Sequence, residues 1–188
     1  MPEVLISEVY QITNRVTGQV IKFLKSTDDT AGEYLEMEAT YLPFSSEPPL
    51  HYHPAQEEFF QVEEGELTIR LNGEVKIYRK GARVHIKPNI RHSMWNSGFK
   101  PTIVNWKIVP AMNTEQFLRT MTRLSNQGKT DKKGMPSFPV LLFLLQKYRK
   151  TFRLDTPAGI LLQLLYILLL PTFCIRNYKN RFNNPSHL

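Results

Sequence analysis

Several features that would assign a class at once are missing from this sequence of 188 residues. Cys174 is its only cysteine, which excludes an intramolecular disulfide and favours a reducing compartment. The N-terminus lacks a basic region followed by an apolar core, so we expect no secretory signal peptide. There is no internal repeat, no low-complexity tract and no nucleic-acid-binding motif. These absences favour a cytoplasmic protein with one globular domain and an appendage.

The formal net charge of +7 is unevenly distributed along the chain. The half that precedes residue 111 is close to neutral, whereas lysine and arginine gather in the C-terminal part. They lie at Arg119, Arg123, Lys129, Lys132, Lys133, Lys147, Arg149, Lys150, Arg153, Arg176, Lys179 and Arg181. An anionic membrane surface or a solvated face explains this distribution better than nucleic acid, which we do not expect as a partner.

Short alternating segments and turns dominate residues 1–110. The segment 34–42 places Leu35, Met37, Ala39 and Tyr41 on one side, which is typical of a half-buried strand. Asn72-Gly73 is a strong hairpin turn pair. We expect strands at 19–25, 34–42, 59–64, 66–71, 74–79, 84–86, 93–96 and 102–109, and an edge strand or arm within 1–18. Many short strands with almost no helix between them predict a mainly β protein, an antiparallel sandwich or barrel.

The pattern becomes helical after Pro110. Asn113 can cap a helix whose apolar residues recur at helical spacing, namely Phe117, Leu118, Met121 and Leu124. A charged loop bounded by Gly128 and Gly134 follows, and then two apolar segments, 140–148 and 158–175. We therefore divide the chain into a β-barrel, 1–110, and a helical C-terminal extension, 111–188.

Histidines and carboxylates gather in one short segment. His51 and His53 point the same way if they share a strand, because a strand alternates its faces at every residue. Glu58 can join them from the next strand, and His92 follows a turn at the expected start of another. Three imidazoles and one carboxylate suit a divalent transition metal such as iron, manganese, nickel or zinc.

The spacing of these residues resembles the two motifs of the cupin superfamily. The segment 51–65, His51-x-His53-x4-Glu58-x6-Gly65, is similar to the first motif, and 81–96 is similar to the second. Lys87 and Asn89 stand where the family usually has proline and glycine, and Ser45 replaces an opening glycine. The resemblance implies an RmlC-like antiparallel double-sheet jelly-roll barrel, with His51, His53, Glu58 and His92 as metal ligands.

The whole chain also resembles cupin-domain proteins in which a Gly-Lys-Thr-x-x-x-Gly-x-Pro loop and two apolar helices follow the barrel. Here that loop is 128–136. The phosphate-binding loop that Gly-Lys-Thr suggests is rejected, because the upstream glycine spacing and the strand-loop-helix context are absent.

A small-molecule pocket is expected beside the metal ligands. Its candidate lining residues are Tyr41, Phe60, Val62, Met94 and Trp106, each of which is alternatively ordinary barrel core. Glu57 and His85 should face outward by the alternation of their strands.

The charge-free segment 158–175 leaves three interpretations open. It is a helix packed on the barrel or against a partner in a homodimer, an interfacial anchor on anionic lipid, or a single membrane span. The last two would add membrane association to the cytoplasmic assignment.

Two functions fit the sequence. One is a metal-dependent enzyme, an oxygenase or an isomerase, acting on a small organic molecule in the barrel. The other is a non-catalytic small-molecule sensor, placed at a membrane by the C-terminal helices. Metal binding alone does not decide whether the protein is an enzyme.

Overall fold

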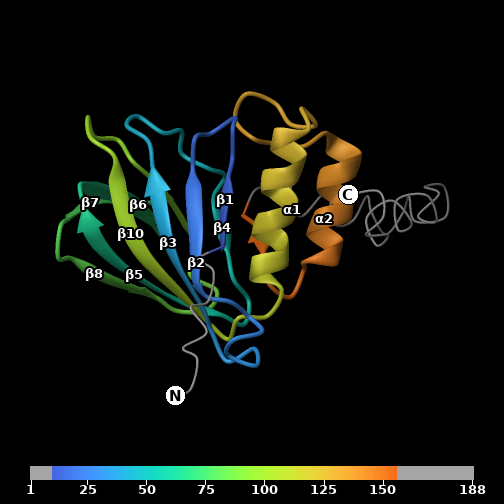
Figure 1. The fold of residues 1–188 in the computed structure, drawn as a ribbon, viewed down its shortest axis with the longest axis horizontal. Coiled ribbons are helices and arrows are strands. Elements are labelled where there is room, and N and C mark those ends of the chain that lie inside the picture. The colour runs from blue at the N-terminus through green and yellow to red at the C-terminus, as the bar shows by residue number, and fades with distance from the viewer. Residues whose placement is uncertain (1–9, 156–188) are drawn as a thin grey trace, which may run out of the picture. The chain divides into compact units, whose positions relative to one another are not determined.

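Two antiparallel sheets form the barrel in this computed structural model, which describes residues 10–155 (Figure 1). The larger sheet has the order β1 (Tyr10–Thr13), β2 (Val20–Lys25), β3 (Leu35–Tyr41), β10 (Thr102–Val109), β5 (Glu57–Glu64), β8 (Arg83–Ile86). The smaller has the order β11 (Arg153–Leu154), β4 (His51–Tyr52), β9 (His92–Trp95), β6 (Glu66–Leu71), β7 (Glu74–Arg79). Because strands distant in sequence are neighbours in both sheets, this is the expected mainly β double-sheet jelly roll, followed by helices.

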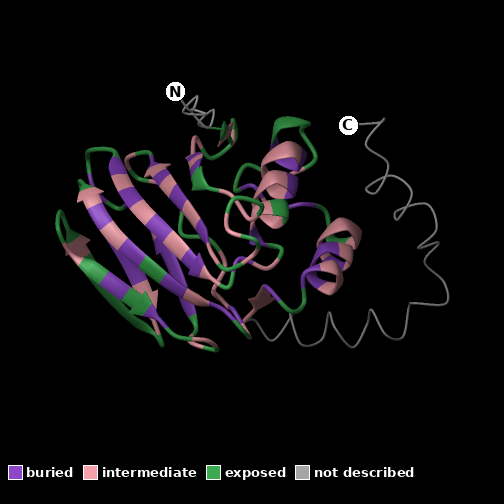
Figure 2. Cartoon of the chain, turned by 60° about the horizontal axis from the view of Figure 1, so that its bottom comes forward, coloured by how far each residue is buried: buried purple, intermediate pink, exposed green. Residues whose placement is uncertain are grey.

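Alternation of burial along the strands builds the core (Figure 2). In β3 the predicted inward residues, including Leu35 and Met37, are buried, while the residues between them are half-buried. Strand β10 lies between β3 and β5, so that Trp106 stands opposite Met37 on one side and Phe60 on the other. The core therefore fills the space between the two sheets.

Turns occur where the sequence predicts them, but the strands near the histidines differ. Asn72 and Gly73 both have positive φ angles and close the hairpin of β6 and β7. Strand β5 begins at Glu57, two residues before the expected start at 59. Strand β4 contains only two residues, because Pro49 and Pro54 lack the N–H groups that would extend its ladder.

Two helices lie side by side at the barrel end near β1 and β4 (Figure 1). Helix α1 (Thr114–Asn126) begins after Asn113, as predicted, although the Asn113 side chain forms no capping hydrogen bond with any described residue. Helix α2 (Phe138–Lys147) contains most of the apolar segment 140–148. Arg119 of α1 lies over the rings of Tyr10 and Phe23, 4.3 and 4.2 Å from their centroids, and so ties the helix to the sheet.

Residues 10–155 belong to one compact unit. The division at residue 110 stays a prediction, and strand β11 of the extension is itself part of the smaller sheet. Within 10–155, no helix is long and apolar enough to cross a membrane. The segment 158–175, on which the membrane predictions rest, lies outside the described residues.

Candidate metal centre

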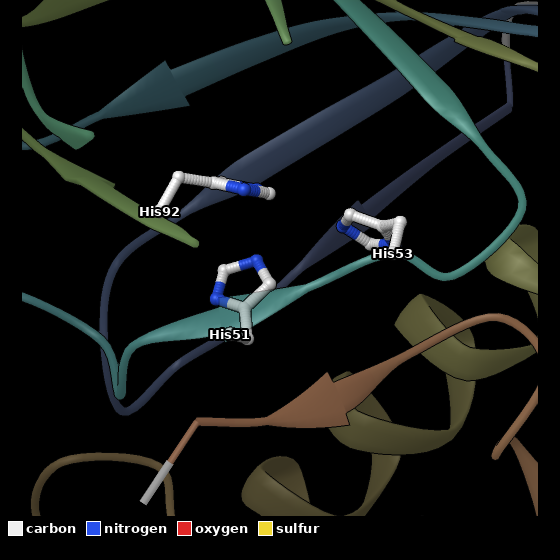
Figure 3. A group of neighbouring side chains, drawn as sticks. All are labelled: His51, His53 and His92. Carbon is white, nitrogen blue, oxygen red and sulfur yellow. The ribbon is translucent and has the colours of Figure 1, made fainter. Parts of the chain in front are cut away.

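Three imidazoles converge inside the barrel, as Figure 3 shows. Their candidate ligand atoms all lie within 4.8 Å of one another. His51 on β4 is the antiparallel partner of His92, the first residue of β9, and side chains that stand opposite each other in this way are close neighbours. His53, just past β4, brings its ring centroid within 5.4 Å of both other rings. The predicted grouping of the histidines is therefore present.

Each imidazole is oriented by a backbone carbonyl that accepts a hydrogen bond from its Nδ1–H. The bonds run from His51 to Pro49 at 3.0 Å, from His53 to Thr151 at 2.7 Å and from His92 to Ile90 at 2.9 Å. Because a carbonyl can only accept, Nδ1 carries the proton and Nε2 keeps its lone pair. This is the arrangement that prepares an imidazole to bind a metal through Nε2.

Glu58 reaches the histidines from the opposite sheet, on β5. Its Oε2 lies 2.8 Å from Nε2 of His92, and its Oε1 lies 3.4 Å from Nε2 of His53. The indole N–H of Trp106 donates to Oε1 at 3.1 Å and holds the carboxylate in place. All four predicted ligands are thus brought together.

The buried atoms at this centre fit a cation. Nε2 of His53, Nε2 of His92 and Oε2 of Glu58 are buried and form no well-aligned hydrogen bond with a described residue, despite the short distance between the last two. Buried polar atoms without partners are rare and costly. Imidazole nitrogens and a carboxylate oxygen are the donors that a divalent transition metal accepts.

The electrostatics keep His51 neutral and Glu58 ionised. Burial, followed by the neighbouring His92 and His53, lowers the pKa of His51 to about 3. Burial alone would raise the pKa of Glu58, but His53 and His92 outweigh it and lower that pKa to about 2. Burial opposes charge on His92 too, yet its contact with Glu58 raises the pKa of His92 overall. The Glu58 carboxylate therefore acts against burial at His92.

A cavity of about 240 Å³ lies beside the histidines. Tyr41, Met94 and Trp106 line it together with His51 and His53. Phe60 and Val62 are not among the described residues that line this cavity, and their part in a ligand pocket stays a prediction. They share the inward face of β5 with Glu58, but they pack in the barrel core, where Phe60 stacks on Trp106 at 5.6 Å.

Glu57 and His85 lie on the outer face of the barrel, as their alternation indicates. Their side chains form an exposed pair with 2.6 Å between Oε2 and Nε2, and the His85 ring stacks on Phe59 at 4.4 Å. This histidine is therefore separate from the metal centre.

Residues 151–155 complete the site, and the sequence analysis missed their part. The Thr151 carbonyl binds His53, while the Phe152 ring lies 4.8 Å from the ring of His51. Strand β11 pairs with β4, and Asp155 forms an ion pair with Arg91 at 3.1 Å. The only local signal in this segment is the aromatic Phe152 within a basic stretch. That signal does not predict that the segment lies against the histidines.

The comparison with protein families agrees with this architecture. Residues 37–107 match the family model described as the cupin domain. This segment is a cupin domain. The match contains all four candidate ligands, and helices α1 and α2 follow the cupin domain outside it.

Solved cupin structures are similar to part of this chain at low sequence identity. An RmlC-like cupin from Shewanella frigidimarina is 17% identical with a TM-score of 0.49, covering 61% of this chain and 96% of that one. A predicted oxalate decarboxylase from Thermotoga maritima is 22% identical with a TM-score of 0.47, covering 55% and 95%. The cupin domain of an XRE family transcriptional regulator from Enterobacter cloacae is 23% identical with a TM-score of 0.43, covering 48% and 95%. No curated protein matches the sequence significantly.

Proposed function

We propose that the cupin domain binds one divalent transition metal through His51, His53, Glu58 and His92 and acts on a small organic molecule held in the adjacent cavity. The observation that carries the proposal is the convergence of three imidazoles whose Nδ1 atoms are all bonded to carbonyls. Iron, manganese, nickel or zinc in this position would supply a Lewis acid or, for the redox-active metals, an electron-transfer centre.

The residues of the chain have distinct tasks in this proposal. Trp106 holds the Glu58 carboxylate, and the carbonyls of Pro49, Thr151 and Ile90 hold the imidazoles. Burial and the Glu58 charge raise the pKa of Tyr41, so its hydroxyl keeps its proton at neutral pH and serves to orient a ligand. Oxygenation and isomerisation both fit such a site, and they differ in whether oxygen is consumed.

Metal analysis of full-length protein purified without a histidine tag tests the first step. We expect about one metal ion per chain in the wild type and substantial loss in His51→Ala and His92→Ala. His85→Ala is the matched control, because it removes a histidine from the outer face and should keep the metal. Equal metal content in all three variants would reject the ligand assignment.

A non-catalytic sensor is the second candidate function. It is favoured by the composition of the cavity wall, whose described polar side chains beyond the candidate ligands are amides, hydroxyls, the Trp106 indole and one lysine. Incubation of metal-loaded protein with small carbonyl compounds, with and without oxygen, separates the two functions through turnover. Flotation of full-length protein with phosphatidylserine-containing or neutral vesicles tests the membrane prediction, and light scattering tests the homodimer.

A further inference from the structure

The wall of the 240 Å³ cavity comes from both parts of the chain. The barrel supplies the histidines, Tyr41, Met94 and Trp106, and the extension covers them with apolar side chains. Helix α1 contributes Phe117 and Met121, among others, and helix α2 contributes Leu141 and Leu145. A ligand that reaches the metal centre therefore rests against a mainly hydrocarbon surface.

One cation interrupts this apolar surface. Lys133 lines the 240 Å³ cavity and also a neighbouring cavity of about 630 Å³, which it shares with Lys132. Tyr41, Met94 and Met135 likewise line both cavities, so the two spaces adjoin. Neither lysine forms an ion pair with another residue in 10–155.

The backbone of the loop that carries Lys133 is held by its own hydrogen bonds. The Asp131 carboxylate accepts hydrogen bonds from the backbone N–H groups of Lys133 at 2.8 Å and Met135 at 2.9 Å. Gly134 has a φ of +80°, which favours glycine, and a Cβ there would lie 3.3 Å from Thr17. The loop 128–136, which stands out in the sequence, thus fixes the backbone of Lys133, a residue that lines both cavities.

We propose that the ligand of this cavity is a small amphiphile with one carboxylate. Lys133 binds the carboxylate, and the apolar body lies against α1 and α2 with its far end toward the histidines. The proposal rests on the proposed function only in taking this cavity as the ligand site. A volume of 240 Å³ corresponds to roughly eight water-sized groups, so octanoate is a suitable probe.

Calorimetric titration of full-length protein with octanoate and with 1-octanol tests the proposal. Because Lys133 is exposed, an ion pair there should contribute about 1 kcal/mol, so we expect octanoate to bind roughly fivefold more tightly than octanol. Lys133→Met should abolish this preference and leave octanol binding unchanged. Lys129→Met is the matched control, because Lys129 lies on the same loop but lines neither cavity. Met121→Trp should weaken both ligands by filling the cavity.

The same titrations after metal removal with EDTA separate the two proposals. A carboxylate preference that survives metal removal and disappears in Lys133→Met supports the assignment to Lys133. A preference that disappears with the metal, or that is equal in Lys133→Met and Lys129→Met, overturns it. If octanoate is not preferred while metal is bound at full occupancy, the ligand class is wrong and the metal site stands. If no metal binds but octanoate is still preferred over octanol, the metal assignment is wrong and the assignment to Lys133 stands.

Discussion

The Nδ1–H group of His53 donates a hydrogen bond of 2.7 Å to the carbonyl of Thr151, a residue 98 positions further along the chain. This bond joins a candidate metal ligand of the cupin domain to the extension beyond α2. The following residue, Phe152, contacts the rings of His51 and Phe117, at 4.8 and 4.9 Å between centroids. The extension therefore contacts the candidate metal centre directly.

Phe152→Ala should weaken metal binding by about tenfold, a typical cost of losing a group that supports a metal ligand. The physical reason is that the His51 ring loses the aromatic surface that limits its rotation and shields it from water. Competition with a chelating dye measures the affinity. Phe138→Ala is the control, since Phe138 is half exposed at the start of α2. Equal affinities in the two variants would show that Phe152 does not support the site.

Trp106→Phe should destabilise the metal-free protein by about 1–3 kcal/mol, because it leaves the buried Glu58 carboxylate without its indole donor. The aromatic ring, and with it the packing on Phe60, is largely retained. Urea unfolding in the presence of EDTA measures the change. Trp95→Phe is the matched substitution at a partly exposed position. If both variants unfold at the same urea concentration, the hydrogen bond contributes nothing measurable.

Glu115→Gln should reduce the loss of stability on acidification. Burial alone would raise the Glu115 pKa, but hydrogen bonds from the Thr27 N–H and the Arg119 guanidinium lower it below its usual value near 4.5. As the pH falls, Glu115 therefore binds a proton in the unfolded chain before it does so in the folded protein. The ionised Glu115 side chain stabilises the fold above about pH 4.5, and this contribution is lost as the pH falls through the pKa of the folded state.

Unfolding in urea at pH 7 and pH 3.5 checks this expectation. Glu115→Gln should be less stable than wild type at pH 7, with a smaller difference at pH 3.5. Glu64 lies at the exposed end of β5 and forms no ion pair among the described residues. Glu64→Gln should therefore have the stability of the wild type at both pH values. A constant difference between Glu115→Gln and wild type would contradict the pKa direction.

Gly65→Ala should destabilise the barrel more than Gly73→Ala. Both glycines have positive φ angles, 73° and 93°, so both substitutions carry backbone strain. Only at Gly65 would the new Cβ meet other atoms, 2.5 Å from the Pro101 carbonyl oxygen. We expect an additional loss of about 1–3 kcal/mol for Gly65→Ala, measured by thermal or urea unfolding. Equal losses of stability in the two variants would mean that the backbone near Pro101 moves away from the new Cβ without a cost in free energy.

The local sequence pattern was sufficient to predict burial where the neighbouring residues in the sequence decide which way a side chain faces. The alternation in β3 predicted which side chains are buried, because adjacent residues of a strand face opposite ways. The same rule placed Glu57 and His85 outside the barrel. It leaves the role of Phe60 and Val62 open, since an inward position on β5 does not distinguish the core from the cavity wall.

The sequence by itself determined the β-barrel, its hairpin turns and the set of four candidate ligands, because strand period, turn chemistry and donor type are local properties. The tertiary structure alone decided that Glu58 meets the histidines from the opposite sheet, that Thr151 orients His53, and that Lys133 borders the 240 Å³ cavity. These relationships depend on where distant segments return in space, and the packing of α1, α2 and β11 against the barrel sets that position.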